Sequence, residues 1–308
     1  MTTYFARALI ALATLALAAP MAAHAAAASG GDRAVPRINS FGGVCTKCEL
    51  SGRKLAGAHF IGANFSGSVL VGSDLREAHF VASSFSNADL SRADLSDSEI
   101  VGANFTGANL SHARLRSTQA RGVAFTGADL SHADFSDAVA QGSVFVKASL
   151  EGAILRSAEL QGATFSKADA LGANFRDADL TGAVLAGGRF DKASFRDADL
   201  SHAVMNGSSF DGADFKDADL AGAILTGVDL SRARGLEQDQ IDSACTDART
   251  RLPGNLIQRG CGIRMIRQSG APRIDVHVRR PMPAVPAAPA APAAPPASPT
   301  PRYLIAPF

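Results

Sequence analysis

Residues 88–95 read Ala88-Asp89-Leu90-Ser91-Arg92-Ala93-Asp94-Leu95, and a large apolar residue returns at every fifth position of this stretch. The register continues unbroken from Leu50 to Leu230. Of the 37 positions in this row, 18 are Leu and 14 are Phe, whereas the whole chain has only 17 Phe. One Ile, one Met and three Ala complete the row, the last at Ala120, Ala140 and Ala170.

A period of five fits neither a helix nor a flat strand. Five helical residues turn the chain by roughly 140° beyond a full circle, and strand residues alternate between two faces. A chain that bends once every five residues would instead return each large residue to one interior. Four bends would close a coil of 20 residues, stacked at about 4.8 Å on the next coil.

Two further features support a 20-residue coil with a filled interior. Two residues before each large position, 25 of 37 residues are Ala and six are Ser, which suits a cramped inner slot. The stretch Phe175–Leu180 recurs at Phe195–Leu200 and, with one change, at Phe215–Leu220. On this count Ala120 and Ala140 lie on one side, and we expect a pinched interior there, offset by Val123 and Val144.

The repeat resembles a known family. Ala88–Arg92 and Ala108–His112 are near-ideal copies of A(D/N)LxX, the motif of the pentapeptide-repeat family. The resemblance implies an all-β fold, a right-handed quadrilateral β-helix of about nine coils over residues 45–234. The side chains of the large residue in each repeat (the large slot) and of the small residue two positions before it (the small slot) would both point inward.

The N-terminus has the pattern of a secretory signal peptide over residues 1–25. Arg7 precedes an apolar run at residues 8–19, and Ala23-His24-Ala25 matches a cleavage site. The alternative is an uncleaved anchor, although the run is too short for a stable membrane span. We expect a periplasmic or secreted protein, with residues 26–44 as a flexible leader.

The C-terminal part divides into a cap and a tail. Residues 235–268 are expected to close the open end of the solenoid, because a last coil otherwise exposes apolar area and strand edges. Residues 236–249 within them predict a short helix. Residues 269–308 are rich in Pro and Ala and predict a disordered tail, which ends in the apolar cluster Tyr303–Phe308.

Four cysteines are present, and export favours disulfides. The two ends of about nine coils are roughly 40–45 Å apart, whereas a disulfide needs Cα atoms within about 7 Å. The sequence therefore predicts the pairs Cys45–Cys48 and Cys245–Cys261. A redox role for the first pair is the alternative, but no thioredoxin-like pattern surrounds it.

Charge argues against nucleic-acid mimicry and nucleic-acid binding. Residues 49–234 hold 23 Asp and Glu against 17 Lys and Arg, a net charge of −6. Some cytoplasmic members of the family resemble DNA and bind a topoisomerase, but such a mimic should be strongly acidic along its length. No basic stripe indicates a nucleic-acid partner either.

Stacked polar residues form candidate ligand columns. Two columns of Asp would stand at about 5 Å spacing and could bind calcium, unless neighbouring Arg and Lys supply the counter-charge. His59 over His79 and His112 over His132 could ligate a metal, although a third ligand is not evident. The Asp columns are Asp177, Asp197 and Asp217, and Asp179, Asp199 and Asp219, beside Arg176, Arg196 and Lys216.

An outward apolar stripe is the third candidate site. Val144, Val184, Val204 and Ile224 each precede a large position at multiples of 20 residues. Exposed apolar patches tend to mark interaction sites, although β-branched residues also simply suit strands. The cluster Tyr303–Phe308 is one candidate to cover the stripe.

The sequence holds no nucleophile motif, phosphate loop or metal-ligand spacing. We expect neither an enzyme nor a cofactor, but a non-catalytic exported scaffold or protein-interaction module. Its partner would be an unknown protein or a second copy of the chain. The alternative function is binding of a small ligand or divalent metal along the Asp or His columns.

Overall fold

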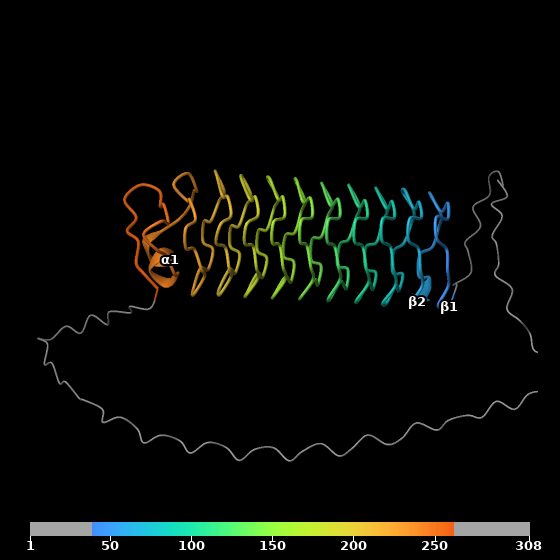
Figure 1. Ribbon diagram of the computed structural model, residues 1–308. Coiled ribbons are helices and arrows are strands. Elements are labelled where there is room, and N and C mark those ends of the chain that lie inside the picture. The colour runs from blue at the N-terminus through green and yellow to red at the C-terminus, as the bar shows by residue number, and fades with distance from the viewer. Residues whose placement is uncertain (1–38, 262–308) are drawn as a thin grey trace, which may run out of the picture. The chain divides into compact units, whose positions relative to one another are not determined.

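The computed structural model of the chain describes residues 39–261 (Figure 1). The predicted signal peptide, most of the predicted leader, the predicted tail and the end of the predicted cap lie outside these residues. Within them, coils of chain stack along one axis as a β solenoid (Figure 1).

Each coil pairs in parallel with the next coil. β1 (Asn39–Phe41) pairs with β2 (His59–Ile61), so that Asn39 lies opposite His59. From Val44–Asn64 to Asp214–Arg234 the bridged residues are always 20 apart. Because the repeat is five residues long and the bridged residues are 20 apart, each coil has four sides. Among the described residues, the ladder is already present at Asn39, upstream of the predicted start at Cys45, and Gly42 adopts the φ of +62° that the corners use.

A tight turn forms each corner between two sides of a coil, and it accounts for the residues that lie between the inward-pointing positions. The N–H of Ala93 donates to the carbonyl of Leu90 at 3.0 Å, which closes a four-residue turn. Arg92, the third residue of that turn, has a φ of +58°, as a type II turn requires. Between corners, Leu90 donates to Asn109 at 2.7 Å and Asn109 donates back to Ala88 at 2.9 Å. Each side is thus a strand one bridge long.

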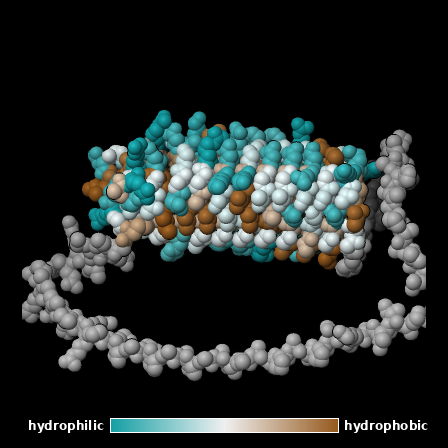
Figure 2. Space-filling model, viewed as in Figure 1, coloured by the Kyte–Doolittle hydropathy of each residue, from teal (hydrophilic) through white to brown (hydrophobic). Residues whose placement is uncertain are grey.

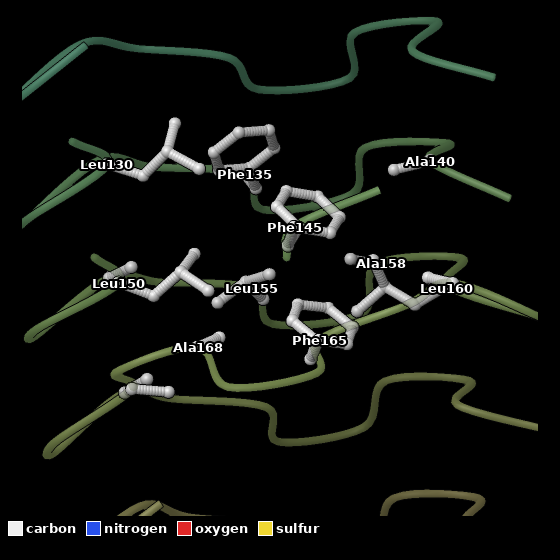
Figure 3. Packing of buried hydrophobic residues seen from close by; sticks show 14 of the residues in the cluster. Leu130, Phe135, Ala140, Phe145, Leu150, Leu155, Ala158, Leu160, Phe165 and Ala168 are labelled. Carbon is white, nitrogen blue, oxygen red and sulfur yellow. The ribbon is translucent and has the colours of Figure 1, made fainter. Parts of the chain in front are cut away.

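The interior is filled by the large and small slots. Every residue of the five-residue row from Phe65 to Leu230 is at most 4% exposed. In one segment, Leu130 and Leu150 lie on one side and Ala140 and Leu160 on another, with phenylalanine rings between them (Figure 3). Phe145 and Phe165 stack with ring centroids 4.6 Å apart.

The alanine breaks lie where the 20-residue coil requires. Ala120 donates to the carbonyl of Val139 at 2.7 Å, so Ala120 and Ala140 share one side, as predicted. Val123 is fully buried and adds interior volume near them. Val144 does not, because it lies half-buried in an outward slot, and that part of the prediction is wrong.

Ala170 has a different neighbour. Phe190 follows it one coil later on the same side, and Gly188 makes room for this ring. A Cβ added at Gly188 would lie 2.6 Å from Cε2 of Phe190.

Hydroxyl groups in the small slots connect successive coils. The Ser143 hydroxyl donates to the carbonyl of Ala120 at 2.6 Å and accepts from the N–H of Val123 at 3.0 Å. Ser98 is equally buried, but its Oγ has no hydrogen-bond partner among residues 39–261. The same slot thus holds both satisfied and unsatisfied hydroxyls.

The C-terminal end of the solenoid is covered by α1 (Gln238–Ser243) and the strand-like segment after it. The Gln240 amide donates to the carbonyls of Phe215 and Ala218 at 2.9 and 2.7 Å, and Ile241 is fully buried. The helix is shorter than the predicted 236–249, because Cys245 already pairs with Ile224 in the ladder. No helix among the described residues is long and apolar enough to cross a membrane.

Both cysteine pairs expected from the length of the solenoid are joined in the structure. Cys45 and Cys48 have Cα atoms 5.4 Å apart at the start of the first complete coil. Cys245 and Cys261 have Cα atoms 4.5 Å apart in the C-terminal cap. The first disulfide holds a tight bend, and the second closes the segment that follows α1.

Candidate functional site

The sides of the solenoid differ in charge. We call uncharged face the side formed by residues 61–64 and the equivalent residues of each later coil, ending at 221–224. Its one charged residue is Arg121. The charged face begins at residues 76–79 and ends at 216–219, with two or three charges per coil from Arg156 onward. Surface residues of like hydropathy accordingly gather in bands along the solenoid (Figure 2).

The predicted apolar stripe lies on the uncharged face. Val144, Val184, Val204 and Ile224 belong to one ladder, in which Thr164 fills the gap between the first two. The three valines are half-buried, and Ile224 is 36% exposed. Because neighbouring strands lie about 4.8 Å apart, their methyl groups form a nearly continuous apolar surface.

The charged face balances its own charges. Asp177 lies between Arg156 and Arg176, with carboxylate-to-guanidinium distances of 3.4 and 3.5 Å. Arg176 also reaches Asp197 at 3.4 Å. Lys216 lies 3.9 Å from Asp217. The structure therefore favours counter-charge by Arg and Lys over a calcium site in this column.

The second Asp column makes turn hydrogen bonds. Asp179, Asp199 and Asp219 each accept the backbone N–H of the residue two positions later, at 2.8 to 3.0 Å. Burial raises the pKa of Asp199, but hydrogen bonds from the side chain and backbone of Ser201 outweigh it and hold the pKa below its usual value. These carboxylates therefore already have donors.

The histidine pairs stack on each other. The ring centroids of His59 and His79 lie 4.2 Å apart, and those of His112 and His132 lie 5.0 Å apart. His79 Nδ1 also contacts Glu99 Oε2 at 2.8 Å. Within residues 39–261, no group of three or more His, Cys, Asp or Glu side chains is arranged to hold a metal ion.

A polar groove near the C-terminal end was not predicted. It has a volume of about 370 Å³, and Ser209, Asp211, Asp229 and Arg232 are among its lining residues. Arg232 crosses from one coil to the previous one and contacts Asp211 at 3.0 Å. The sequence pattern gave no signal for it, because the contact joins two different corner slots 21 residues apart.

Comparison with known proteins agrees with this architecture. A family model for pentapeptide repeats matches in eight copies over residues 45–80, 78–119, 121–156, 158–197 and 193–232, more than half of the chain. The chain belongs to the pentapeptide-repeat family. No curated protein matches this pentapeptide-repeat chain.

Several solved pentapeptide-repeat structures are similar. HetL, involved in heterocyst differentiation regulation in the cyanobacterium Nostoc sp. strain PCC 7120, is 25% identical with a TM-score of 0.51, covering 70% of this chain and 86% of HetL. QnrB1, a plasmid-mediated fluoroquinolone resistance protein, is 26% identical with a TM-score of 0.32, covering 60% and 89%. A protein from the Arabidopsis thaliana thylakoid lumen is 32% identical with a TM-score of 0.27, covering 34% and 70%.

Sequence reasoning identified part of the uncharged face of this pentapeptide-repeat protein. It singled out the four members of the apolar stripe, but it missed that the whole side around them is neutral. Sorting all residues by their place in the 20-residue coil reveals the pattern, because one side then retains only Arg121 as a charge. The feature that identifies this side in the sequence is its near-complete lack of charged residues.

Proposed function

We propose that this chain is a non-catalytic exported scaffold that binds a protein partner, or a second copy of itself, through the uncharged face. The observation that carries the proposal is the run of neutral side chains over successive coils, which contains the apolar stripe. The predicted signal peptide and the two disulfides support export, because disulfides persist in oxidising compartments.

A neutral β face is well suited to association. Interface cores are depleted of charged residues, because a charge that loses water without gaining a partner costs free energy. On the charged face, a partner would have to displace water from at least one charged side chain in every coil. On the uncharged face it would cover mostly methyl groups, hydroxyls and amides.

The filled interior supports a role without catalysis. Phenylalanine, leucine and alanine side chains occupy the inside of the solenoid between residues 65 and 230. A substrate pocket would need space that these side chains already take. The chain therefore acts through its outer surfaces.

Val204→Asp tests the uncharged face, and Val139→Asp is its matched control. Both valines are half-buried, directly precede an inner residue of the five-residue row and take part in the ladder, but Val139 lies on the charged face. We expect Val204→Asp to lower the recovery of proteins bound to the mature chain, or its self-association, at least tenfold. Val139→Asp should leave both unchanged, and the thermal midpoints of the two variants should be similar.

Equal loss of association in both variants would contradict a specific face, and no loss in either would exclude the stripe. The alternative function, binding of a divalent metal along the Asp or His columns, is tested separately. Calorimetric titration of the tag-free chain with calcium and with zinc should give no binding heat. A saturable heat that Asp197→Asn or His79→Gln removes would favour metal binding instead.

A further inference from the structure

Cys45 borders an apolar hollow of about 210 Å³ at the end of the solenoid that carries the first disulfide. Val44, Leu50 and Phe60 also line this hollow, and Val44 is 79% exposed. Cys45 itself is half-buried, whereas Phe65, its equivalent one coil later, is only 4% exposed. The first disulfide therefore adjoins open space rather than the packed interior.

The corner between Cys45 and Cys48 is held by hydrogen bonds that do not involve sulfur. The Ser68 hydroxyl of the next coil donates to the Cys45 carbonyl and accepts the N–H of Cys48 at 3.1 Å. The N–H of Cys45 also donates to the Asn64 carbonyl at 2.8 Å. The N–H of Val69 donates to the Cys48 carbonyl at 2.9 Å. Breaking the sulfur–sulfur bond would leave all of these donors and acceptors in place.

The same corner forms elsewhere without cysteines. The Ser143 hydroxyl bridges the Ala120 carbonyl and the Val123 N–H in the same way. Lys47 has a φ of +57°, and Gly122, its equivalent in that corner, has a φ of +63°. The first and last Cα atoms of such a four-residue turn lie within about 7 Å of each other, which is also the limit for a disulfide. The fold therefore keeps the two cysteines at bonding distance in the reduced state as well.

The second disulfide closes a much longer loop. Cys245 and Cys261 are 16 residues apart in the sequence, whereas the cysteines of the first pair are three apart. A longer loop costs more conformational entropy to close, so its disulfide restricts the unfolded chain more strongly. The Cys245–Cys261 bond therefore stabilises the C-terminal cap, whereas the fold depends less on the first disulfide.

We infer that Cys45 and Cys48 form a reversible thiol–disulfide exchange site whose substrates are dithiols. This activity goes beyond the proposed binding function and needs no contact with the uncharged face. A substrate thiolate that enters the hollow attacks Cys45 Sγ, forms a mixed disulfide and releases Cys48 as a thiolate. The second substrate thiolate then attacks the substrate sulfur of the mixed disulfide and releases Cys45. The substrate leaves as a disulfide, and its two electrons and two protons remain on the cysteine pair.

Two single substitutions in the full chain test which sulfur is attacked. Cys48→Ala leaves the Cys45 thiol beside the hollow, and Cys45→Ala leaves the Cys48 thiol. Alanine already occupies the small slot in most repeats and the large slot at Ala120, so both variants should fold. With glutathione disulfide, we expect Cys48→Ala to form a mixed disulfide at least tenfold faster than Cys45→Ala. Equal rates, or a faster reaction of Cys45→Ala, would overturn the inference.

The unmodified chain provides an independent measurement. After reduction with dithiothreitol, we expect the amides of Cys45 and Val69 to keep the slow hydrogen exchange of the oxidised chain, because their ladder bonds do not depend on sulfur. Glutathione disulfide should then restore the Cys45–Cys48 bond without accumulation of a mixed disulfide, because Cys48 displaces the glutathione. Faster exchange at these amides after reduction, or a persistent mixed disulfide at Cys45, would mark the bond as structural and overturn the inference.

Discussion

Ser143 and Ser98 occupy the same small slot of the frame in different coils, and both are fully buried. Ser143 bonds a carbonyl and an N–H of the preceding coil, whereas the Ser98 Oγ has no partner among the described residues. A satisfied hydroxyl contributes about 0.5–1.5 kcal/mol, and an unsatisfied one costs free energy. We predict that Ser143→Ala lowers the free energy of unfolding by about 1 kcal/mol, measured by urea denaturation.

Ser98→Ala is the matched control for this prediction. The same atom is removed from the same slot, but no hydrogen bond is lost, so the free energy of unfolding should stay equal or rise. A loss of stability in Ser98→Ala as large as that in Ser143→Ala would contradict the account, because slot geometry rather than hydrogen bonding would then decide the effect.

For individual residues, the sequence predicted which positions are buried better than it predicted which side chains contact each other. Leu, Phe and Ala at fixed spacing identified the inner positions, and the structure buries them. The spacing did not decide whether Asp177 binds a cation or pairs with Arg156 and Arg176, since both need the same stacked columns. That choice depends on side-chain conformations, which the repeat does not specify.

The C-terminal cap is the element whose stability should depend on acidity. The N–H of Gly227 donates to Asp247 at 2.8 Å, and this bond, with donors from Thr250 and Arg249, lowers the pKa of Asp247 to about 2. A carboxyl group with a lowered folded-state pKa stabilises the fold above its unfolded pKa, near 3.8. The contribution is lost as the pH falls from about 4 toward 2.

We therefore predict a fall in the thermal midpoint between pH 5 and pH 2 that is smaller in Asp247→Asn than in the unmodified chain. Asparagine keeps an oxygen that can accept from Gly227 but does not titrate. The measurement is thermal unfolding followed by circular dichroism at each pH. Identical falls in both proteins would show that the contact between Asp247 and Gly227 does not contribute to the pH dependence.

The elements also show where sequence reasoning was incomplete. Residues 236–249 predicted one helix, but the helical pattern did not reveal that Cys245 would rejoin the ladder beside Ile224. Pairing with the last coil competes with helix formation there, and the Cys245–Cys261 disulfide lies in the paired segment. Likewise, the sequence pattern did not predict β1. The five-residue row has the small polar Ser40 at this point, so no large apolar residue marked a side of the solenoid before Cys45.

At the scale of the whole solenoid, the row of five predicted the shape, and the distribution of charge around the coil suggests the use. The row determines the 20-residue register and hence which residues share a side. Because a charge on any side leaves the interior undisturbed, the repeat itself does not require a neutral side. The uncharged face is therefore the feature of the surface that the fold alone does not explain.

Site-specific photo-crosslinking in the full chain tests the proposed use of this face most directly. A photoreactive residue is placed at position 204 on the uncharged face and, in a second protein, at position 139 on the charged face. We predict a discrete crosslinked adduct from position 204, none from position 139, and loss of the adduct when Val184→Asp is added. Equal adducts from both positions, or an adduct only from position 139, would contradict the account.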